Sequence, residues 1–213
     1  MSRGKSRSRF VLILGGARSG KSSLALRLAE TWWTHPLYLA TAEVTDREME
    51  QRIALHRRAR GAHWLCHEEP LDVAAVVRRP PRGCDGVLMD CVTIWLSNAL
   101  LREGEKGVER RKADLLHALQ NAPRDVILVS NEVGLGIVPA SKLGRQFRDL
   151  AGWVNQDLAA QADAVVFVAA GLPLVMKGRI EFPSAAPTAK RKPGERRRKA
   201  ARTAATARPA RRR

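Results

Sequence analysis

Short apolar runs alternate along the chain with longer amphipathic segments. An apolar run bounded by glycine or polar residues is typical of a strand that is buried on both faces of a parallel sheet. The runs that fit this pattern predict strands at 10–14, 37–40, 87–90, 125–130 and 164–169. A closing hairpin is predicted over 175–182, where Lys177 and Gly178 interrupt the apolar pattern.

Between these runs, apolar residues recur at the three- and four-residue spacing of a helix. Helices are therefore predicted at 22–33, 45–58, 93–101, 108–121 and 141–161. Thr45 and Glu48 form a capping-box pattern at the start of the second helix. Strands that alternate with helices predict an α/β fold, in which helices cover both faces of a mostly parallel central sheet.

A glycine-rich loop follows the first predicted strand and opens the first predicted helix. Its sequence, Gly15-Gly16-Ala17-Arg18-Ser19-Gly20-Lys21-Ser22, fits the phosphate-binding pattern G-x-x-x-x-G-K-[ST]. In such a loop, backbone N–H groups and the positive end of the helix dipole surround the phosphates. Lys21 would neutralise the outer phosphates, and the Ser22 hydroxyl would bind Mg²⁺. The loop predicts a P-loop nucleoside-triphosphate enzyme, because a purely structural glycine turn does not need Lys and Ser at these positions.

Two carboxylates are expected at the same edge of the sheet as this loop. Asp90 ends the predicted strand 87–90, where the second magnesium-binding residue of such an enzyme stands, although a capping role is the alternative. Glu132 follows the strand 125–130, and ligands collect at the carboxyl ends of strands in open α/β sheets. A solvated loop acid is an equally good interpretation of Glu132.

A histidine on the predicted helix 45–58 is a candidate nucleophile. Arg57, Arg58 and Arg60 follow His56 directly. A neutral imidazole can attack phosphorus, and guanidinium groups can bind a triphosphate and stabilise charge on a leaving pyrophosphate. A histidine on a partly apolar helix face more often has a structural role. The catalytic interpretation of His56 therefore depends on the three arginines beside it.

The positive charge of the chain is concentrated at its two ends. Of the net charge of +17, residues 184–213 carry +11 and residues 1–9 carry +4. Both ends are predicted to be disordered and basic, flanking one domain at 10–183, because they have too little apolar surface to offset the entropy of ordering. The tail could contact nucleic acid or another anionic surface in a salt-dependent way, or could be a solvated extension without a role.

The remaining composition restricts the compartment. No apolar run approaches the ~20 residues of a membrane-spanning helix, and the run at 10–14 is too short for a secretion signal. Cys66, Cys84 and Cys91 fit neither a disulfide framework nor a zinc pattern and are expected to be packing residues. A cytoplasmic protein is the resulting expectation.

Several segments in a fixed order carry a family resemblance over about residues 10–176. They are the glycine-rich loop, Tyr38-Leu-Ala-Thr41, Glu48-Met49 with Arg52-Ile53 and His56, Ala62-His-Trp64, Ser130-Asn-Glu-Val-Gly-Leu-Gly-Ile-Val-Pro139, Phe147-Arg-Asp-Leu-Ala-Gly152 and Val154-Asn-Gln156. Together they resemble the bifunctional adenosylcobinamide kinase / adenosylcobinamide-phosphate guanylyltransferase family of cobalamin biosynthesis. The resemblance implies a RecA-like P-loop fold and a homo-oligomer, with a trimer as the expected state.

The resemblance also implies two reactions. ATP or GTP would phosphorylate adenosylcobinamide, and GMP would then pass from GTP to that phosphate through a guanylyl-histidine, giving adenosylcobinamide-GDP. His56 matches the guanylylated histidine, and Lys21 is the second expected catalytic residue. The expected nucleotide-binding positions are Gly15, Gly16, Ala17, Arg18, Ser19, Gly20, Lys21, Ser22, Ala40, Thr41, Ala42, Arg57, Arg58, Ala59, Arg60, Glu68 and Asp90, with Ser22 and Asp90 also at Mg²⁺.

The chain departs from the family pattern in three places. Leu55 precedes His56 where family members often carry a second histidine, Asp90 stands where they carry Glu, and the cationic tail has no counterpart. Two other functions therefore remain open from the sequence: a single-activity P-loop kinase or nucleotidyltransferase, and a nucleic-acid-associated P-loop NTPase that uses its tail. The general base of a kinase step is not assigned, and Glu132 and Asp90 are its candidates.

Overall fold

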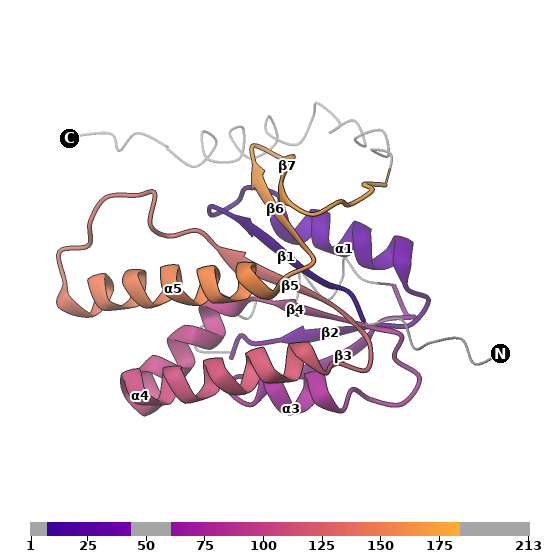
Figure 1. Ribbon diagram of the computed structural model, residues 1–213, viewed down its shortest axis with the longest axis horizontal. Coiled ribbons are helices and arrows are strands. Elements are labelled where there is room, and N and C mark those ends of the chain that lie inside the picture. Colours follow the sequence, from indigo (N-terminus) through magenta and orange to yellow (C-terminus); the bar gives the residue numbers. More distant parts are fainter. Residues whose placement is uncertain (1–7, 44–60, 184–213) are drawn as a thin grey trace, which may run out of the picture. The chain divides into compact units, whose positions relative to one another are not determined.

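The computed structural model describes residues 8–43 and 61–183 (Figure 1). All of these residues belong to one of the two units of the chain, Met1–Pro183, and the other unit, Ser184–Arg213, lies outside them. The predicted helix 45–58 and both basic ends also lie outside the described residues, except for Ser8 and Arg9.

The described residues form one mixed sheet of seven strands in the order β3-β2-β4-β5-β1-β6-β7. The strands are β1 (Phe10–Gly15), β2 (Pro36–Ala40), β3 (Leu65–Glu68), β4 (Gly86–Asp90), β5 (Asp125–Asn131), β6 (Ala164–Ala169) and β7 (Leu172–Lys177). Every pair is parallel except β6 with β7. The predicted fold class, an α/β fold with a mostly parallel central sheet, is confirmed.

Helices cover both faces of the sheet (Figure 1). Helix α1 (Lys21–Trp32) lies on one face, and α3 (Val73–Arg78), α4 (Val92–Gln120) and α5 (Lys142–Gln161) lie on the other. Alternate residues of β1 point to the two sides: Leu12 packs in the core beneath α3, α4 and α5, and Ile13 packs beneath α1. Burial on both faces explains why β1 reads as a continuous apolar run.

Helix α4 joins the two helices predicted at 93–101 and 108–121. The helix is kinked at Gly104, where φ is 68° and ψ is −171°. Residues with a Cβ rarely adopt this backbone conformation. Glu103 bridges the break by accepting hydrogen bonds from Arg111 Nε at 2.8 Å and from Arg111 Nη2 at 2.6 Å. This bond to Arg111 holds the pKa of Glu103 below its usual range.

The structure corrects the sequence prediction at three elements. Strand β3 and helix α3 were not predicted, and the predicted hairpin at 175–182 was wrong. The antiparallel pair is instead β6 with β7, and its two-residue turn at Ala170 and Gly171 has φ of 51° and 81°. Positive φ at both turn positions matches the twist of paired strands, and Lys177 ends β7 rather than occupying a turn.

Two of the three cysteines are packing residues, as the sequence predicts. Cys84 and Cys91 are buried, but Cys66 lies exposed on β3, so its predicted packing role was wrong. Within the described ranges, none of the helices combines the length and the apolar character that crossing a membrane requires.

Candidate active site

The glycine-rich loop lies where the sequence predicts it, between β1 and α1. Gly15 ends β1 and sits between Asn131 of β5 and Val168 of β6. A Cβ on Gly15 would lie 2.5 Å from the Val168 carbonyl oxygen and 2.6 Å from Ser19 Oγ, so only glycine fits this close approach. Gly20 then caps the start of α1 in a left-handed conformation.

Hydrogen bonds from three parts of the chain define the shape of the loop. Ser19 N donates to the Gly16 carbonyl oxygen at 3.2 Å, within the loop itself. Glu132 N donates to the Gly15 carbonyl oxygen at 3.0 Å, and Gly171 N, from the β6–β7 turn, donates to the Ser19 carbonyl oxygen at 2.8 Å. The segments that follow β5 and β6 therefore brace the loop from outside.

Lys21 and Ser19 supply polar groups inside this loop. Lys21 is 8% exposed, and its Nζ donates to the Gly16 carbonyl oxygen at 3.1 Å, so the ammonium group lies over the loop. An ammonium has three donors and can bind a phosphate while it keeps this bond. Ser19 Oγ is buried and has no hydrogen-bond partner among the described residues, which fits a loop that binds a polar ligand.

Three predicted site residues end neighbouring strands on the other side of β5. Ala40 of β2 is in register with Glu68 of β3 on one side and with Asp90 of β4 on the other. Asp90 is half-buried and accepts a hydrogen bond from Tyr38 Oη at 3.3 Å, whereas Glu68 is exposed. The carboxylates of Glu68 and Asp90 thus belong to the same edge of the sheet as the glycine-rich loop.

Thr41 is engaged by the backbone of the strand next to it. Its Oγ1 donates to the Cys91 carbonyl oxygen at 2.8 Å and accepts from Cys91 N at 2.9 Å. Asn98 Nδ2 donates to the Thr41 carbonyl oxygen at 2.9 Å. Thr41 is fully buried and its side chain ties the end of β2 to the end of β4, whereas Ala40 and Ala42 are half-buried.

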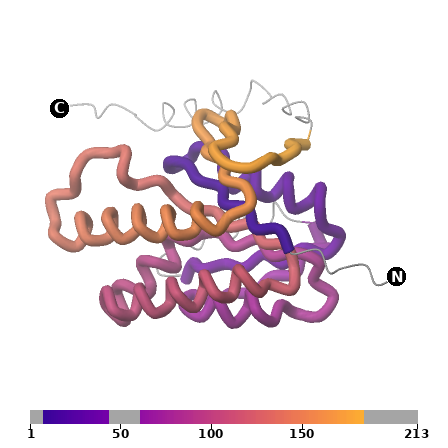
Figure 2. The backbone as a smooth tube through the Cα atoms, viewed as in Figure 1, coloured from indigo at the N-terminus to yellow at the C-terminus, as the bar shows by residue number. Residues whose placement is uncertain are grey.

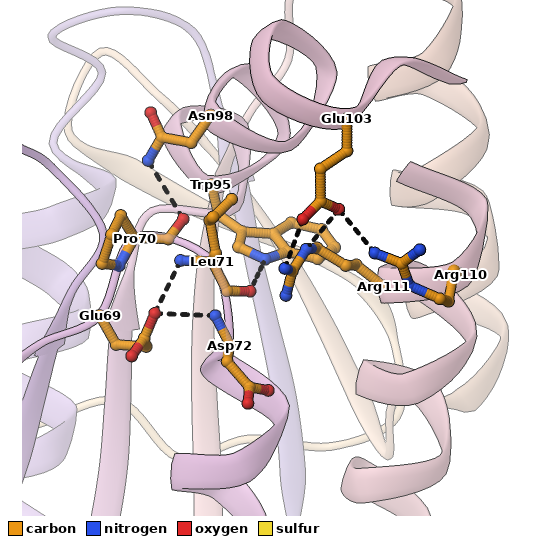
Figure 3. Close-up of polar contacts among 9 residues, drawn as sticks. All are labelled: Glu69, Pro70, Leu71, Asp72, Trp95, Asn98, Glu103, Arg110 and Arg111. Atoms are coloured by element: carbon orange, nitrogen blue, oxygen red, sulfur yellow. Dashed lines mark hydrogen bonds and ion pairs between the residues drawn. The ribbon is translucent and has the colours of Figure 1, made fainter. Parts of the chain in front are cut away.

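The residues that follow β3 are fixed to α4 by polar contacts (Figure 3). Trp95 Nε1 donates to the Leu71 carbonyl oxygen at 2.9 Å, and Asn98 Nδ2 donates to the Pro70 carbonyl oxygen at 3.1 Å. Glu69 Oε1 accepts from Leu71 N at 2.9 Å and from Asp72 N at 2.8 Å. These bonds hold the segment next to Glu68 in one position.

A buried polar network at the end of β5 was not assigned a role from the sequence. Asn131 Nδ2 donates to Thr93 Oγ1 at 2.6 Å, Asn155 Nδ2 donates to the Asn131 carbonyl oxygen at 3.2 Å, and Ser130 Oγ donates to Asn155 Oδ1 at 2.7 Å. The network joins β5 to α4 and α5. Strand β5 lies between β1, which leads into the glycine-rich loop, and β4, which ends at Asp90. The network therefore fixes the backbone that separates these two parts of the site.

The cysteine beside this network is not a nucleophile. Cys91 is buried, and burial raises the pKa of its thiol, with the neighbouring Asp90 carboxylate adding to the effect. Its Sγ lies 3.2 Å from Thr93 Oγ1. The thiol is therefore protonated at neutral pH and contributes packing and a weak hydrogen bond.

Glu132 also lies at this edge, as the sequence predicts. Its backbone N–H is bound to Gly15, and its Oε1 accepts from Gly134 N at 2.6 Å. The carboxylate therefore shapes the turn that follows β5. The other predicted site residues, His56, Arg57, Arg58, Ala59 and Arg60, lie outside the described residues.

The arrangement can bind a phosphate chain together with a divalent cation. The loop and the start of α1 supply donors, and Ser22 and Asp90 supply the hydroxyl and carboxylate oxygens that Mg²⁺ prefers. Within the described ranges, no group of three or more His, Cys, Asp or Glu side chains could hold a metal by itself. A cation at this site would therefore complete its coordination with oxygens of a bound phosphate.

Comparisons with known proteins identify similar chains. The model of a family described as cobinamide kinase / cobinamide phosphate guanyltransferase matches residues 11–176. The bifunctional adenosylcobalamin biosynthesis protein CobP of Pseudomonas aeruginosa is 47% identical over 167 residues, which is 78% of this chain and 96% of that protein. The bifunctional adenosylcobalamin biosynthesis protein CobU of Escherichia coli is 38% identical over 181 residues, covering 79% of this chain and 99% of that protein. Among solved structures, the RadB recombinase aligns with 84% of this chain and 85% of its own at a TM-score of 0.47 and 11% identity.

Proposed function

The chain belongs to the cobinamide kinase / cobinamide phosphate guanyltransferase family, and on this premise we propose that it catalyses two consecutive reactions. It phosphorylates adenosylcobinamide with ATP or GTP, and it then transfers GMP from GTP to adenosylcobinamide-phosphate through a guanylyl-histidine, giving adenosylcobinamide-GDP. The observation that carries the proposal is a complete phosphate-binding loop at the end of β1 in a chain matched by the family over residues 11–176.

In the kinase step, the chain positions a triphosphate and neutralises its charge. The substrate hydroxyl oxygen bonds to the γ-phosphorus, the bond from that phosphorus to the bridging oxygen breaks, and the nucleoside diphosphate leaves. The hydroxyl proton passes to a base or to water. Backbone N–H groups of residues 16–22 and the Lys21 ammonium stabilise the charge that develops on the phosphate oxygens.

The proposed magnesium ligands are Ser22 and Asp90, and their oxygens fit the ion. Mg²⁺ is usually held by one or two protein oxygens together with substrate phosphates, and the described residues offer no closed metal cage. When bound, the ion would neutralise charge on the β- and γ-phosphates. The hydrogen bond from Tyr38 Oη keeps the Asp90 carboxylate at the strand end, where it is available to that ion.

In the guanylyltransfer step, His56 is the proposed nucleophile. An imidazole nitrogen bonds to the α-phosphorus of GTP, and pyrophosphate leaves. A phosphate oxygen of adenosylcobinamide-phosphate then attacks the same phosphorus, and the P–N bond breaks to release the histidine. Arg57, Arg58 and Arg60 are proposed to stabilise the pyrophosphate, and Ala59 completes that segment. The remaining proposed nucleotide contacts come from Ala40, Thr41, Ala42 and Glu68.

An assay of the purified chain tests this function directly. We expect adenosylcobinamide with Mg²⁺ and ATP to yield the phosphorylated corrinoid, and addition of GTP to yield the GDP-linked product. Phosphorylation without the GDP-linked product would reduce the function to a single-activity kinase. Absence of both products, with an intact fold by circular dichroism, would refute the proposal.

A homo-oligomer is proposed, and the sheet edge at β7 supports it. All six residues of β7 are exposed, including Leu172, Leu174 and Met176. An edge strand with exposed apolar side chains is a site of association with another chain, and β7 is an edge strand of the sheet among the described residues. A trimer is the state implied by the family resemblance, and a cytoplasmic location is proposed from the unpaired cysteines.

The cationic tail is proposed to be an accessory that contacts nucleic acid or other anionic surfaces. Deletion of residues 184–213 is expected to leave kinase and guanylyltransferase turnover within about twofold and to abolish salt-sensitive retention on DNA, because the tail carries +11 of the +17 net charge. The measurement is paired turnover and DNA-column elution. A matched control keeps the tail length and replaces its Lys and Arg residues by Gln.

Loss of turnover on deletion would show that the tail is part of the catalytic unit. It would also contradict the proposed boundary of the enzymatic domain at 183.

A further inference from the structure

We propose that the apolar loop, defined as residues 133–140 between β5 and α5, holds the corrin macrocycle of the acceptor substrate. This inference rests on the proposed kinase function and adds to it the part of the chain that recognises the acceptor. The loop follows β5 directly and extends past the carboxyl ends of the strands, on the same side as the glycine-rich loop (Figures 1 and 2).

The first link is the connection between the apolar loop and the phosphate-binding site. Asn131 is in register with Gly15, and Glu132 N donates to the Gly15 carbonyl oxygen at 3.0 Å. The apolar loop therefore begins one residue after a direct bond to the glycine-rich loop. Because its two ends are fixed, a loop of eight residues can extend no more than about 14 Å beyond them, half of its full length at about 3.5 Å per residue.

The second link is the exposure of large aliphatic side chains on this loop. Leu135 is 81% exposed, Ile137 is 97% exposed and Val138 is 59% exposed. By contrast, Val133, at the base of the loop, packs against the hydrophobic core. Three neighbouring aliphatic side chains in water beside an active site are typical of a surface that an apolar ligand covers.

The third link is that the ends of the loop are fixed. At its start, Gly134 N donates to Glu132 Oε1 at 2.6 Å. At its end, Arg145 Nη1 donates to the carbonyl oxygens of Pro139 and Ala140 at 3.0 and 2.7 Å. The exposed side chains are thus presented by a segment with defined ends, which limits the entropy that is lost when a ligand binds.

The chemistry of the acceptor fits this surface. A corrin macrocycle carries methyl groups as well as amide side chains around its rim, and aliphatic side chains bury the methyl groups favourably. Its reacting hydroxyl lies on a short aminopropanol arm, so the ring must be held within the length of that arm from the γ-phosphate. The apolar loop is an exposed aliphatic surface that begins at the glycine-rich loop. The exposed aliphatic side chains of β7 also begin next to that loop, but they are the ones proposed above to contact another chain.

Substitution of the loop side chains tests the inference. We expect Leu135→Asn and Ile137→Asn each to raise the KM for adenosylcobinamide about 10-fold, and the double variant about 100-fold, because each removes one large aliphatic contact. The KM for ATP should change less than twofold. Leu101→Asn, which replaces a leucine on α4 that is 68% exposed, is the matched control and should leave both KM values unchanged.

Three outcomes would show whether the apolar loop holds the corrin macrocycle. An unchanged KM for adenosylcobinamide in the double variant would overturn the inference. A fall in molar mass by light scattering, together with the raised KM, would also overturn it, because the loop would then be a contact with a second copy of the chain. If the wild-type chain does not phosphorylate adenosylcobinamide at all, the proposed function fails first, and equilibrium dialysis of the coloured corrinoid then shows whether the loop binds it.

Discussion

Lys21→Met is expected to lower kcat of the kinase reaction about 100- to 1,000-fold, which is the usual loss when one preorganised donor to a developing charge is removed. The Lys21 side chain is 8% exposed and its ammonium lies over the glycine-rich loop, bonded to the Gly16 carbonyl oxygen. Methionine keeps the unbranched stem in the buried position and removes only the charge and its donors. Steady-state kinetics with saturating ATP measure the loss.

The same variant should also slow guanylylation by GTP, because one loop is proposed to hold the triphosphate in both reactions. Lys106→Met is the matched control, since Lys106 is an exposed lysine on α4. Circular dichroism and the urea midpoint verify that each variant is folded. Kinase activity within threefold of wild type in folded Lys21→Met would show that the loop does not bind the transferred phosphate as proposed.

His56→Ala is expected to abolish guanylyltransfer, with a loss on the order of 10,000-fold or more, and to leave the kinase step active. Removal of a nucleophile eliminates the covalent route, whereas phosphorylation at the γ-phosphorus needs no covalent intermediate. The wild-type chain should retain ³²P after denaturation when GTP carries α-label and should retain none when GTP carries γ-label, because pyrophosphate departs. The phosphorylated corrinoid should accumulate in the variant.

His63→Ala is the matched control for the nucleophile. His63 is exposed and its ring contacts the Trp64 ring, so it carries no proposed chemical role. This variant should retain α-label as wild type does. Label on denatured His56→Ala, at the wild-type level, would place the covalent guanylyl group on a different residue.

Much of the sheet could be predicted because its central strands are buried on both faces. The strand predicted at 164–169 coincides with β6, and the strand predicted at 10–14 lacks only Gly15 of β1. Strand β3 gave no such signal, because Leu65 is half-buried and the other three residues are exposed. Its pairing with β2 depends on backbone groups, which every sequence supplies. Helix α3 has six residues, too few to show a helical period.

Part of the candidate site could likewise be predicted from the sequence, and part of it could not. The glycine-rich loop is local in sequence, so its position between β1 and α1 could be predicted from eight consecutive residues. The network of Thr93, Asn131 and Asn155 joins residues 38 and 24 positions apart, and it forms only where α4 and α5 pack against the end of β5. Two polar residues at the end of an apolar strand, Ser130 and Asn131, were the available signal.

The bond between the β6–β7 turn and the glycine-rich loop joins two parts of the chain that lie about 150 residues apart in sequence. The strand that precedes the loop, β1, likewise pairs with β5 and β6 rather than with a neighbour in sequence. A fragment that ended before β6 would carry the whole phosphate-binding motif without the strand and the turn that brace it.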